Sequence, residues 1–110
     1  MQPQMKVYLL DENGERFFGE GPYQLLRLME QLGSLRSAAT EMGMAYTKAI
    51  RILTKAEQAL GYPLTIRSTG GRHGGGSTLT EEGKALLEQY EAYRLRCRQE
   101  NMRIFQEIFK

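Results

Sequence analysis

The sequence has little of what disulfide scaffolds, metal clusters and membrane proteins require. Its 110 residues include one cysteine, Cys97, and one histidine, His73. A single thiol excludes an internal disulfide and any zinc cluster built on several thiolates, and it favours a reducing cytoplasm. No apolar run approaches the ~20 residues that cross a bilayer, and the N-terminal apolar stretch is too short for a signal peptide. We therefore expect a cytoplasmic protein with no cofactor, no metal ion and no membrane partner.

The composition is that of an ordinary globular protein, with 41% hydrophobic and 25% charged residues. A length of 110 residues predicts one domain, spanning 1–110. The net charge is only +2, but residues 44–78 hold five bases against one acid. A local excess of positive charge is what a polyanion binder requires. The alternative is a chance cluster on a solvated surface.

The N-terminal region predicts a β-hairpin over residues 5–18. Strands are expected at Met5–Leu10 and Glu15–Phe18. Asp11–Gly14 forms the turn between them, because Asn-Gly tolerates positive φ at little steric cost. An isolated hairpin is unstable in water, so this one must pack on the helices that follow.

Residues 22–61 predict three helices. Pro22 suits a first helical turn, where its missing N–H costs nothing, and Gly33 ends the first helix. Ser34 is a good N-cap for a second, short helix over 35–42. A tight turn then leads into a third helix, which gives the order of a helix-turn-helix.

The third helix is expected over 46–60, with Gly61 as its end and Ala45 as a poor N-cap. At ~100° per residue, its apolar side chains share one arc. These are Ala49, Ile50, Leu53, Ala56 and Leu60. The opposite arc is cationic and lacks an acid, and it consists of Thr47, Lys48, Arg51 and Lys55.

A second hairpin, the wing, is predicted over residues 63–80. Its tip is nearly free of side chains because of five glycines: Gly70, Gly71, Gly74, Gly75 and Gly76. Only Arg72 and His73 project from it. A thin tip that carries an arginine suits the minor groove of DNA. The alternative is a floppy hairpin loop.

Residues 81–110 predict one long helix, capped by Thr80. Such a helix extends ~40 Å, which is farther than a small core reaches. It carries an apolar stripe at helical spacing: Tyr90, Tyr93, Cys97, Asn101, Ile104 and Ile108. We expect a second copy of the chain, related by a two-fold axis, to cover this stripe, which makes the segment a dimerisation helix. Asn101 would fix the register of the two helices. Alternatively, the helix folds back over its own domain.

From Gly21 to about Tyr93 the sequence resembles the N-terminal DNA-binding domain of the ModE family, whose helix-turn-helix is akin to that of LysR-type regulators. LLRLMEQLGSLRSAATEMGMAYTKAIRIL is similar to the family's helix-turn-helix, and GYPLTIRSTGGRHGGGSTLTEEGKALLEQY is similar to its wing and dimer helix. The resemblance implies an α+β, mainly α, winged helix-turn-helix. It also implies a homodimer that binds a roughly palindromic operator in double-stranded DNA.

The expected DNA contacts come from the second helix's N-terminus, the third helix and the wing tip. They are Ser34, Tyr46, Thr47, Lys48, Arg51, Lys55, Arg72 and His73. Two departures from the family matter. Ala45 stands where the family usually has a serine cap. Family members continue into molybdate-binding domains, whereas this chain ends at Lys110. We therefore expect either a separate ligand-sensing protein or a signal other than molybdate.

An enzyme is not expected. GGRHGGG lacks the Lys-Ser/Thr of a phosphate-binding loop and does not open a helix, and His73 has no acid or nucleophile near it in sequence. The prediction is a transcriptional regulator of the ModE type, with a link to molybdate or metal transport. The alternatives are a winged-helix protein-interaction module that does not bind DNA, and a redox or metal response through Cys97.

Overall fold

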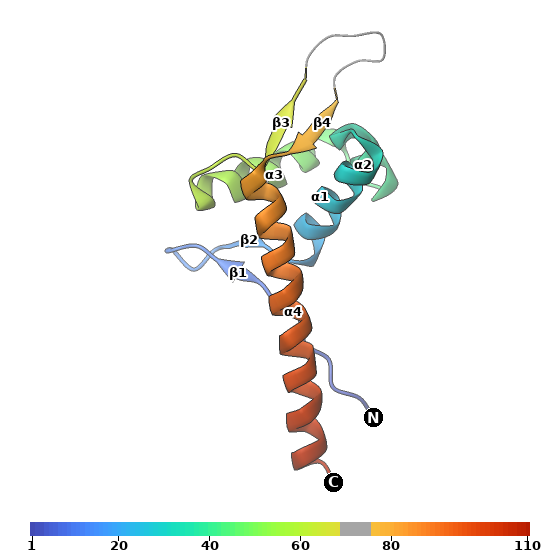
Figure 1. Cartoon of the computed structure of the whole chain (residues 1–110), viewed down its shortest axis with the longest axis vertical. Helices are drawn as coiled ribbons and strands as arrows, with labels where there is room; N and C mark the ends of the chain where they lie inside the picture. Colours follow the sequence, from blue (N-terminus) through green and yellow to red (C-terminus); the bar gives the residue numbers. More distant parts are fainter. Residues whose placement is uncertain (69–75) are drawn as a thin grey trace.

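The computed structural model describes residues 1–68 and 76–110. Its elements are β1 (Leu9–Leu10), β2 (Arg16–Phe18), α1 (Glu20–Leu32), α2 (Leu35–Glu41), α3 (Tyr46–Leu60), β3 (Thr65–Arg67), β4 (Ser77–Leu79) and α4 (Glu81–Ile108). Helices α1 to α3 gather at one end with the β3–β4 pair, while α4 extends to the other end, where both termini lie (Figure 1). The predicted mainly helical α+β fold is confirmed.

The helix ends follow the local signals in the sequence. Gly33 and Gly61 terminate α1 and α3 in the left-handed conformation, at φ values of 74° and 80°. Glycine adopts this conformation without steric penalty. The Ser34 side chain caps α2 by accepting a hydrogen bond of 3.1 Å from the Ser37 N–H. Ala45 provides no side-chain cap for α3, as expected from its methyl group.

The N-terminal hairpin is shorter than the sequence predicts. The strand expected over Met5–Leu10 pairs only at Leu9–Leu10, with a register irregularity between these two residues. The reason is the short partner strand, which has three residues and ends where the chain turns into α1. Residues 5–8 therefore lack a strand partner, and the Val7 carbonyl instead accepts a hydrogen bond of 2.9 Å from the Tyr90 hydroxyl.

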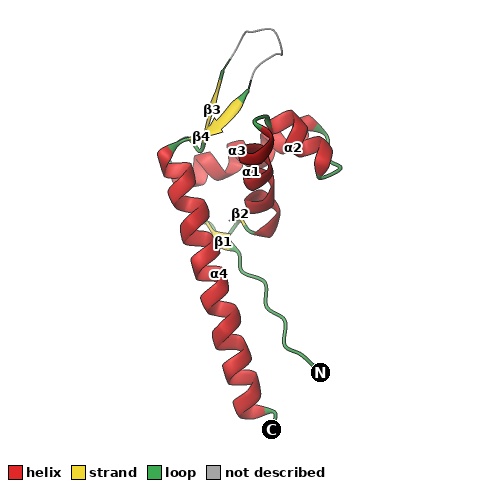
Figure 2. Ribbon diagram, turned by 45° about the vertical axis from the view of Figure 1, so that its right-hand side comes forward, coloured by secondary structure: helices red, strands yellow, loops and turns green. Residues whose placement is uncertain are grey.

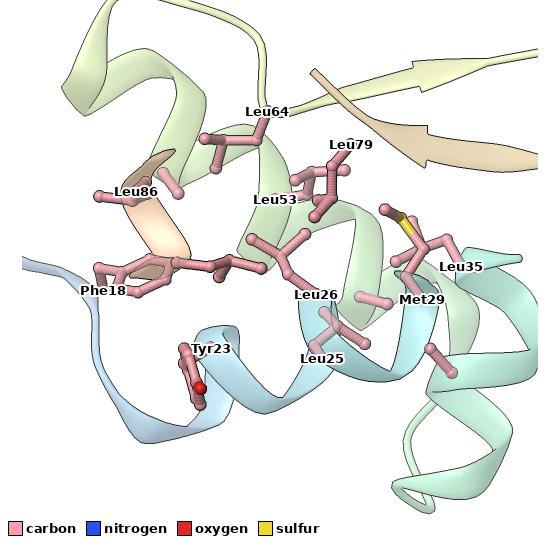
Figure 3. Packing of buried hydrophobic residues seen from close by; sticks show 14 of the residues in the cluster. Phe18, Tyr23, Leu25, Leu26, Met29, Leu35, Leu53, Leu64, Leu79 and Leu86 are labelled. Carbon is pink, nitrogen blue, oxygen red and sulfur yellow. The ribbon is translucent and has the colours of Figure 1, made fainter. Parts of the chain in front are cut away.

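One hydrophobic core joins all four helices with residues from β2 and the wing (Figure 3). Its largest fully buried side chains are Phe18, Leu25, Leu26, Met29, Leu35, Leu64 and Leu87. Burying each such side chain stabilises the fold by about 1.5–3 kcal/mol. Of the predicted apolar arc of α3, Ala49, Leu53 and Ala56 are buried. Ile50 and Leu60 are half-buried at the edge of the core.

Hydrogen bonds from one side chain and from the backbone hold the wing against the helices. The Thr80 hydroxyl donates a hydrogen bond of 2.8 Å to the Pro63 carbonyl and accepts one of 2.9 Å from the Gly83 N–H. One side chain thus caps α4 and ties it to the start of the wing. The Ser77 N–H donates to the Gly33 carbonyl at 3.0 Å, which joins β4 to the junction between α1 and α2.

The first three turns of α4 pack on the rest of the molecule, and the remainder projects from it (Figure 2). Arg27 bonds to Glu91 at 2.9 Å, and Glu20 pairs with both Arg94 and Arg98, so three ion pairs link α1 to α4. Tyr90 is only 2% exposed, and its ring centroid lies 5.1 Å from that of Phe18 and 5.3 Å from that of Tyr23. The assignment of Tyr90 to a dimer stripe is therefore wrong, because this ring is already buried within its own chain.

Candidate nucleic-acid interface

The outer face of α3 is the set Thr47, Lys48, Arg51 and Lys55, and all four residues are exposed. They lie opposite Ala49, Leu53 and Ala56, whose burial holds α3 against the core. Within the described residues, none of the three bases forms an ion pair. The face therefore presents three uncompensated cations and a hydroxyl to solvent, which are the groups that contact phosphates and base edges.

The single acid of α3, Glu57, has a structural task elsewhere. Its carboxylate accepts a hydrogen bond of 2.7 Å from the Leu64 N–H, at the start of the wing. A charged acceptor makes this a strong bond, and it satisfies a buried residue's backbone donor. The carboxylate is thereby turned toward the wing junction. The outer face of α3 keeps its positive potential as a result.

Arg36 is a basic residue beside the interface that the sequence patterns did not indicate. Its guanidinium carbon lies 4.0 Å from the ring centroid of Tyr46, the first residue of α3. Such a cation–π contact is worth about 0.5–1 kcal/mol at an exposed site. It joins α2 to the start of α3, where no side-chain cap exists. Tyr46 is half-buried against the core, while Arg36 is exposed and adds a fourth cation near the outer face of α3.

Ser34 lies at the start of α2 and is half-buried. Its hydroxyl oxygen already accepts the Ser37 N–H, so the capping role is established. Its hydroxyl hydrogen remains able to donate. The structure thus gives Ser34 a clear part in holding the helix-turn-helix, and its expected phosphate contact stays a prediction.

The base of the wing lies within the described residues, and the tip lies outside them. Expectations for Gly70, Gly71, Arg72, His73, Gly74 and Gly75 fall on this undescribed part. Gly76 is described. Its N–H donates to the Ser68 hydroxyl at 3.2 Å, and its carbonyl accepts the Ser68 N–H at 3.0 Å. Arg67, on β3, is exposed and places one more base on the wing.

The outer part of α4 carries the rest of the expected stripe. Tyr93, Ile104 and Ile108 are 56%, 45% and 68% exposed. Cys97 and Asn101 are half-buried and lie on the same stripe. Phe105 and Phe109 stack on each other near the end of the helix, with ring centroids 5.1 Å apart. These side chains leave a line of apolar surface exposed on α4.

The described residues offer neither a metal cluster nor a membrane-spanning helix. Over 1–68 and 76–110, no group of three His, Cys, Asp or Glu side chains is arranged to hold a metal ion. Among the described helices, none is both long and apolar enough for a membrane span. The long α4 fails because charged residues recur throughout its length.

The family model for bacterial regulatory helix-turn-helix proteins of the lysR family matches residues 23–84. The chain is similar to the transcriptional regulator ModE of Haemophilus influenzae, at 35% identity over 62% of this chain and 27% of that protein. It is 33% identical to the DNA-binding transcriptional dual regulator ModE of Escherichia coli, over 61% of this chain and 26% of that protein. It is 32% identical to the molybdenum-pterin-binding protein MopB of Rhodobacter capsulatus, over 76% of this chain and 31% of that protein.

These similarities confirm the predicted resemblance to ModE and its LysR-like helix-turn-helix. The matched description is that of a regulatory protein, which agrees with the prediction of a regulator and not an enzyme. The aligned part spans roughly a quarter to a third of the relatives' own length, at 26%, 27% and 31%.

Proposed function

Because the chain belongs to the lysR family of bacterial regulatory helix-turn-helix proteins, we propose that it is a sequence-specific DNA-binding transcriptional regulator. In this proposal α3 lies in the major groove, where the second helix of a helix-turn-helix contacts base edges. The observation that carries it is the exposed, basic outer face of α3. The one acid of this helix, Glu57, points away from that face and bonds to the Leu64 N–H.

Each residue of the interface has a distinct task in the proposal. Arg51 and Lys48 donate to guanine O6 and N7 or to phosphates, and Thr47 contacts a thymine methyl group or a phosphate. Lys55 and Ser34 bind the sugar-phosphate backbone. Tyr46 packs against Arg36, which orients the start of α3, and it also contacts the DNA in this proposal. Arg72 and His73 follow the neighbouring minor groove from the wing tip.

The electrostatic part of the proposal is tested by measuring affinity for a random-sequence duplex at increasing salt. The three bases on the outer face of α3 are expected to contribute about −3 per copy to the slope of log affinity against log salt. Lys48→Ala reduces the slope by about one. Lys110→Ala leaves it unchanged, because Lys110 lies at the opposite end of the molecule (Figure 1). Absence of duplex binding, with salt-insensitive capture of a protein, favours an interaction module instead.

The sequence-specific part is tested by selecting bound fragments from genomic DNA with the purified protein. Arg51→Ala then weakens binding to the selected operator by about 1–3 kcal/mol and relaxes the preference at one position. Equal affinity and equal preference for the two proteins would remove Arg51 from base recognition.

We further propose that the regulator binds its operator as a homodimer through α4. The exposed apolar side chains of Tyr93, Ile104 and Ile108 support this, since they repeat at helical spacing on the projecting part of the helix. A two-fold axis there would set two copies of α3 about one DNA turn, ~34 Å, apart. Asn101 would fix the register.

Sedimentation measures this association directly. The double variant Ile104→Glu and Ile108→Glu is expected to be monomeric and to lose affinity for a palindromic operator. Gln99→Glu adds a charge to the same helix at an exposed position and serves as the control. A double variant that remains dimeric would contradict this interface.

We also propose that the regulated genes concern molybdate or metal transport, which the printed name of one relative, the molybdenum transport protein ModE of Azotobacter vinelandii, supports. In this proposal a separate protein senses the ligand. The genomic selection tests the first part by naming the bound genes. The proposed sensor is tested by purifying this chain from its natural host and identifying the proteins that purify with it.

A further inference from the structure

A hollow of about 500 Å³ lies between the N-terminal hairpin, the first turn of α1 and α3. Its volume falls within the range of sites that bind small molecules. Its apolar lining includes Phe17, Phe18, Pro22 and Ile52. Phe18 is buried and the other three are half-buried, so they form the floor.

The charged lining of the hollow is mostly basic. Lys6, Arg16 and Lys55 are exposed and therefore lie at its mouth. In the described part of the chain, none of these three forms an ion pair. The one acid of the lining, Glu20, is bonded to Arg94 and lies 3.5 Å from Arg98. The hollow thus keeps a positive mouth over an apolar floor.

The wall formed by Tyr8 is fixed by close packing. A Cβ on Gly19 would lie 2.9 Å from the Tyr8 ring, so this ring packs directly on the glycine backbone. The guanidinium carbon of Arg16 lies 4.3 Å from the centroid of the same ring. The wall and one cation of the mouth are therefore already in place without a ligand, which reduces the ordering cost of binding.

We propose that this hollow binds a small organic anion with an apolar, planar body. A carboxylate or sulfonate group would bond to Lys6, Arg16 and Lys55 at the mouth. The planar body would cover Phe17, Pro22 and Ile52. An inorganic oxyanion would leave the floor uncovered, and a neutral apolar molecule would leave the three cations without a partner. The proposal concerns a surface that the proposed DNA contacts share only through Lys55.

Naphthoate is the probe for the first test, which follows the amide NMR spectrum of the full, isotope-labelled chain during titration. Saturable shifts are expected at Phe17, Gly21, Ile52 and Lys55. Two matched probes separate the contributions: naphthamide keeps the body without the charge, and acetate keeps the charge without the body. Naphthamide is expected to bind about tenfold more weakly, because a charge-assisted hydrogen bond is lost. Acetate is expected to bind more weakly still, because it buries no apolar body. Shifts that do not saturate, or that are equal for naphthamide and naphthoate, overturn the proposal.

Gly21 offers a variant that fills the hollow. It lines the hollow in the first turn of α1, and a Cβ there meets nothing within 4 Å. Gly21→Phe is expected to weaken naphthoate binding roughly tenfold or more, because the ring occupies the apolar floor. Gln24→Phe is the control, because it adds the same ring at an exposed position of α1 that does not line the hollow, and it keeps the affinity of the natural chain.

A charge variant tests the mouth independently. Arg16→Gln is expected to weaken naphthoate about tenfold, since a charge-assisted hydrogen bond is lost. Lys84→Gln removes an exposed cation outside the hollow and leaves the affinity unchanged. The dispersion of the amide spectrum shows whether each variant is folded. Folded Gly21→Phe and Arg16→Gln proteins with the affinity of the natural chain would refute the site, and neither result depends on DNA binding.

Discussion

Gly83 packs so closely against Leu64 that no side chain fits between them, because a Cβ on Gly83 would overlap the Leu64 carbonyl oxygen. Gly83 is buried in the first turn of α4, one turn from the Thr80 cap. The Leu64 N–H is in turn held by Glu57. The start of the wing, the end of α3 and the start of α4 therefore meet at Leu64, through one close backbone contact and one carboxylate hydrogen bond.

Gly83→Ala is expected to lower the free energy of unfolding by about 1–3 kcal/mol, although alanine favours helices, because α4 must move away from Leu64. Gly21→Ala places the same methyl group in α1 with no neighbour within 4 Å. It is expected to raise the free energy of unfolding by up to about 1 kcal/mol. Urea denaturation at fixed protein concentration measures both. Equal effects of the two substitutions would contradict the close contact.

Tyr90→Phe removes the hydroxyl that bonds to the Val7 carbonyl and should cost about 1 kcal/mol at neutral pH. It should also change the alkaline behaviour. The pKa of Tyr90 is raised above its ordinary value of 10.0, mainly by burial and to a smaller extent by the negative charge of Glu20. A raised pKa in the folded state means that this stability is fully present below the pKa of the unfolded chain. It is lost as the pH rises from there through the folded pKa.

The free energy of unfolding of the natural chain should therefore fall above pH ~10, and this fall should be smaller in Tyr90→Phe. Tyr93→Phe is the control, because Tyr93 is 56% exposed. It should keep the alkaline fall of the natural chain. An equal fall in Tyr90→Phe would show that the Tyr90 hydroxyl ionises as freely in the folded chain as in the unfolded one.

Glu57→Ala is expected to destabilise the protein by about 1.5–3 kcal/mol, because the Leu64 N–H loses a charged acceptor. Gln58→Ala, at the neighbouring exposed position, should change the free energy of unfolding by less than about 0.5 kcal/mol. Denaturant titration of the two variants measures the difference. If Glu57→Ala matched Gln58→Ala, the hydrogen bond would have no energetic role.

Arg36 and Tyr46 should be coupled energetically through their cation–π contact. A double-mutant cycle with Arg36→Ala and Tyr46→Leu is expected to give a coupling of about 0.5–1 kcal/mol in the free energy of unfolding. The same cycle with Arg36→Ala and Tyr93→Leu, where Tyr93 lies on α4, is expected to give none. A coupling of zero in the first cycle would show that the contact between Arg36 and Tyr46 does not stabilise the start of α3.

A ligand in the hollow should weaken DNA binding, because Lys55 belongs both to the hollow and to the outer face of α3. Saturating naphthoate is expected to reduce the affinity of the natural chain for a random-sequence duplex severalfold. The Gly21→Phe variant should bind the duplex equally well with and without naphthoate. Fluorescence anisotropy of a labelled duplex checks both, and an equal loss in the two proteins would point to competition away from the hollow.

The helix boundaries could be predicted because their causes are local. The conformations of Gly33 and Gly61 depend on their own backbone, and the Ser34 cap spans four residues. The outer face of α3 could also be predicted, since helical periodicity alone separates Lys48 and Arg51 from the buried Ala49 and Leu53.

The missed features depend on contacts between distant segments. Periodicity places Tyr90 on the same stripe as Ile104 but does not say which part of α4 packs on its own chain. The contacts of Glu57 with Leu64 and of Arg36 with Tyr46 require the tertiary arrangement. The sequence shows Gly83 only as a weak helix former, while its buried backbone contact appears in three dimensions. The hollow likewise combines three separate segments.

The bond from Ser77 to the Gly33 carbonyl has a consequence for how a signal would travel. Gly33 ends α1, and its carbonyl also accepts the hydrogen bond from β4. A tilt of α1 would therefore act directly on the base of the wing. In the proposed regulator, this link would couple the orientation of α1 to that of the base of the wing.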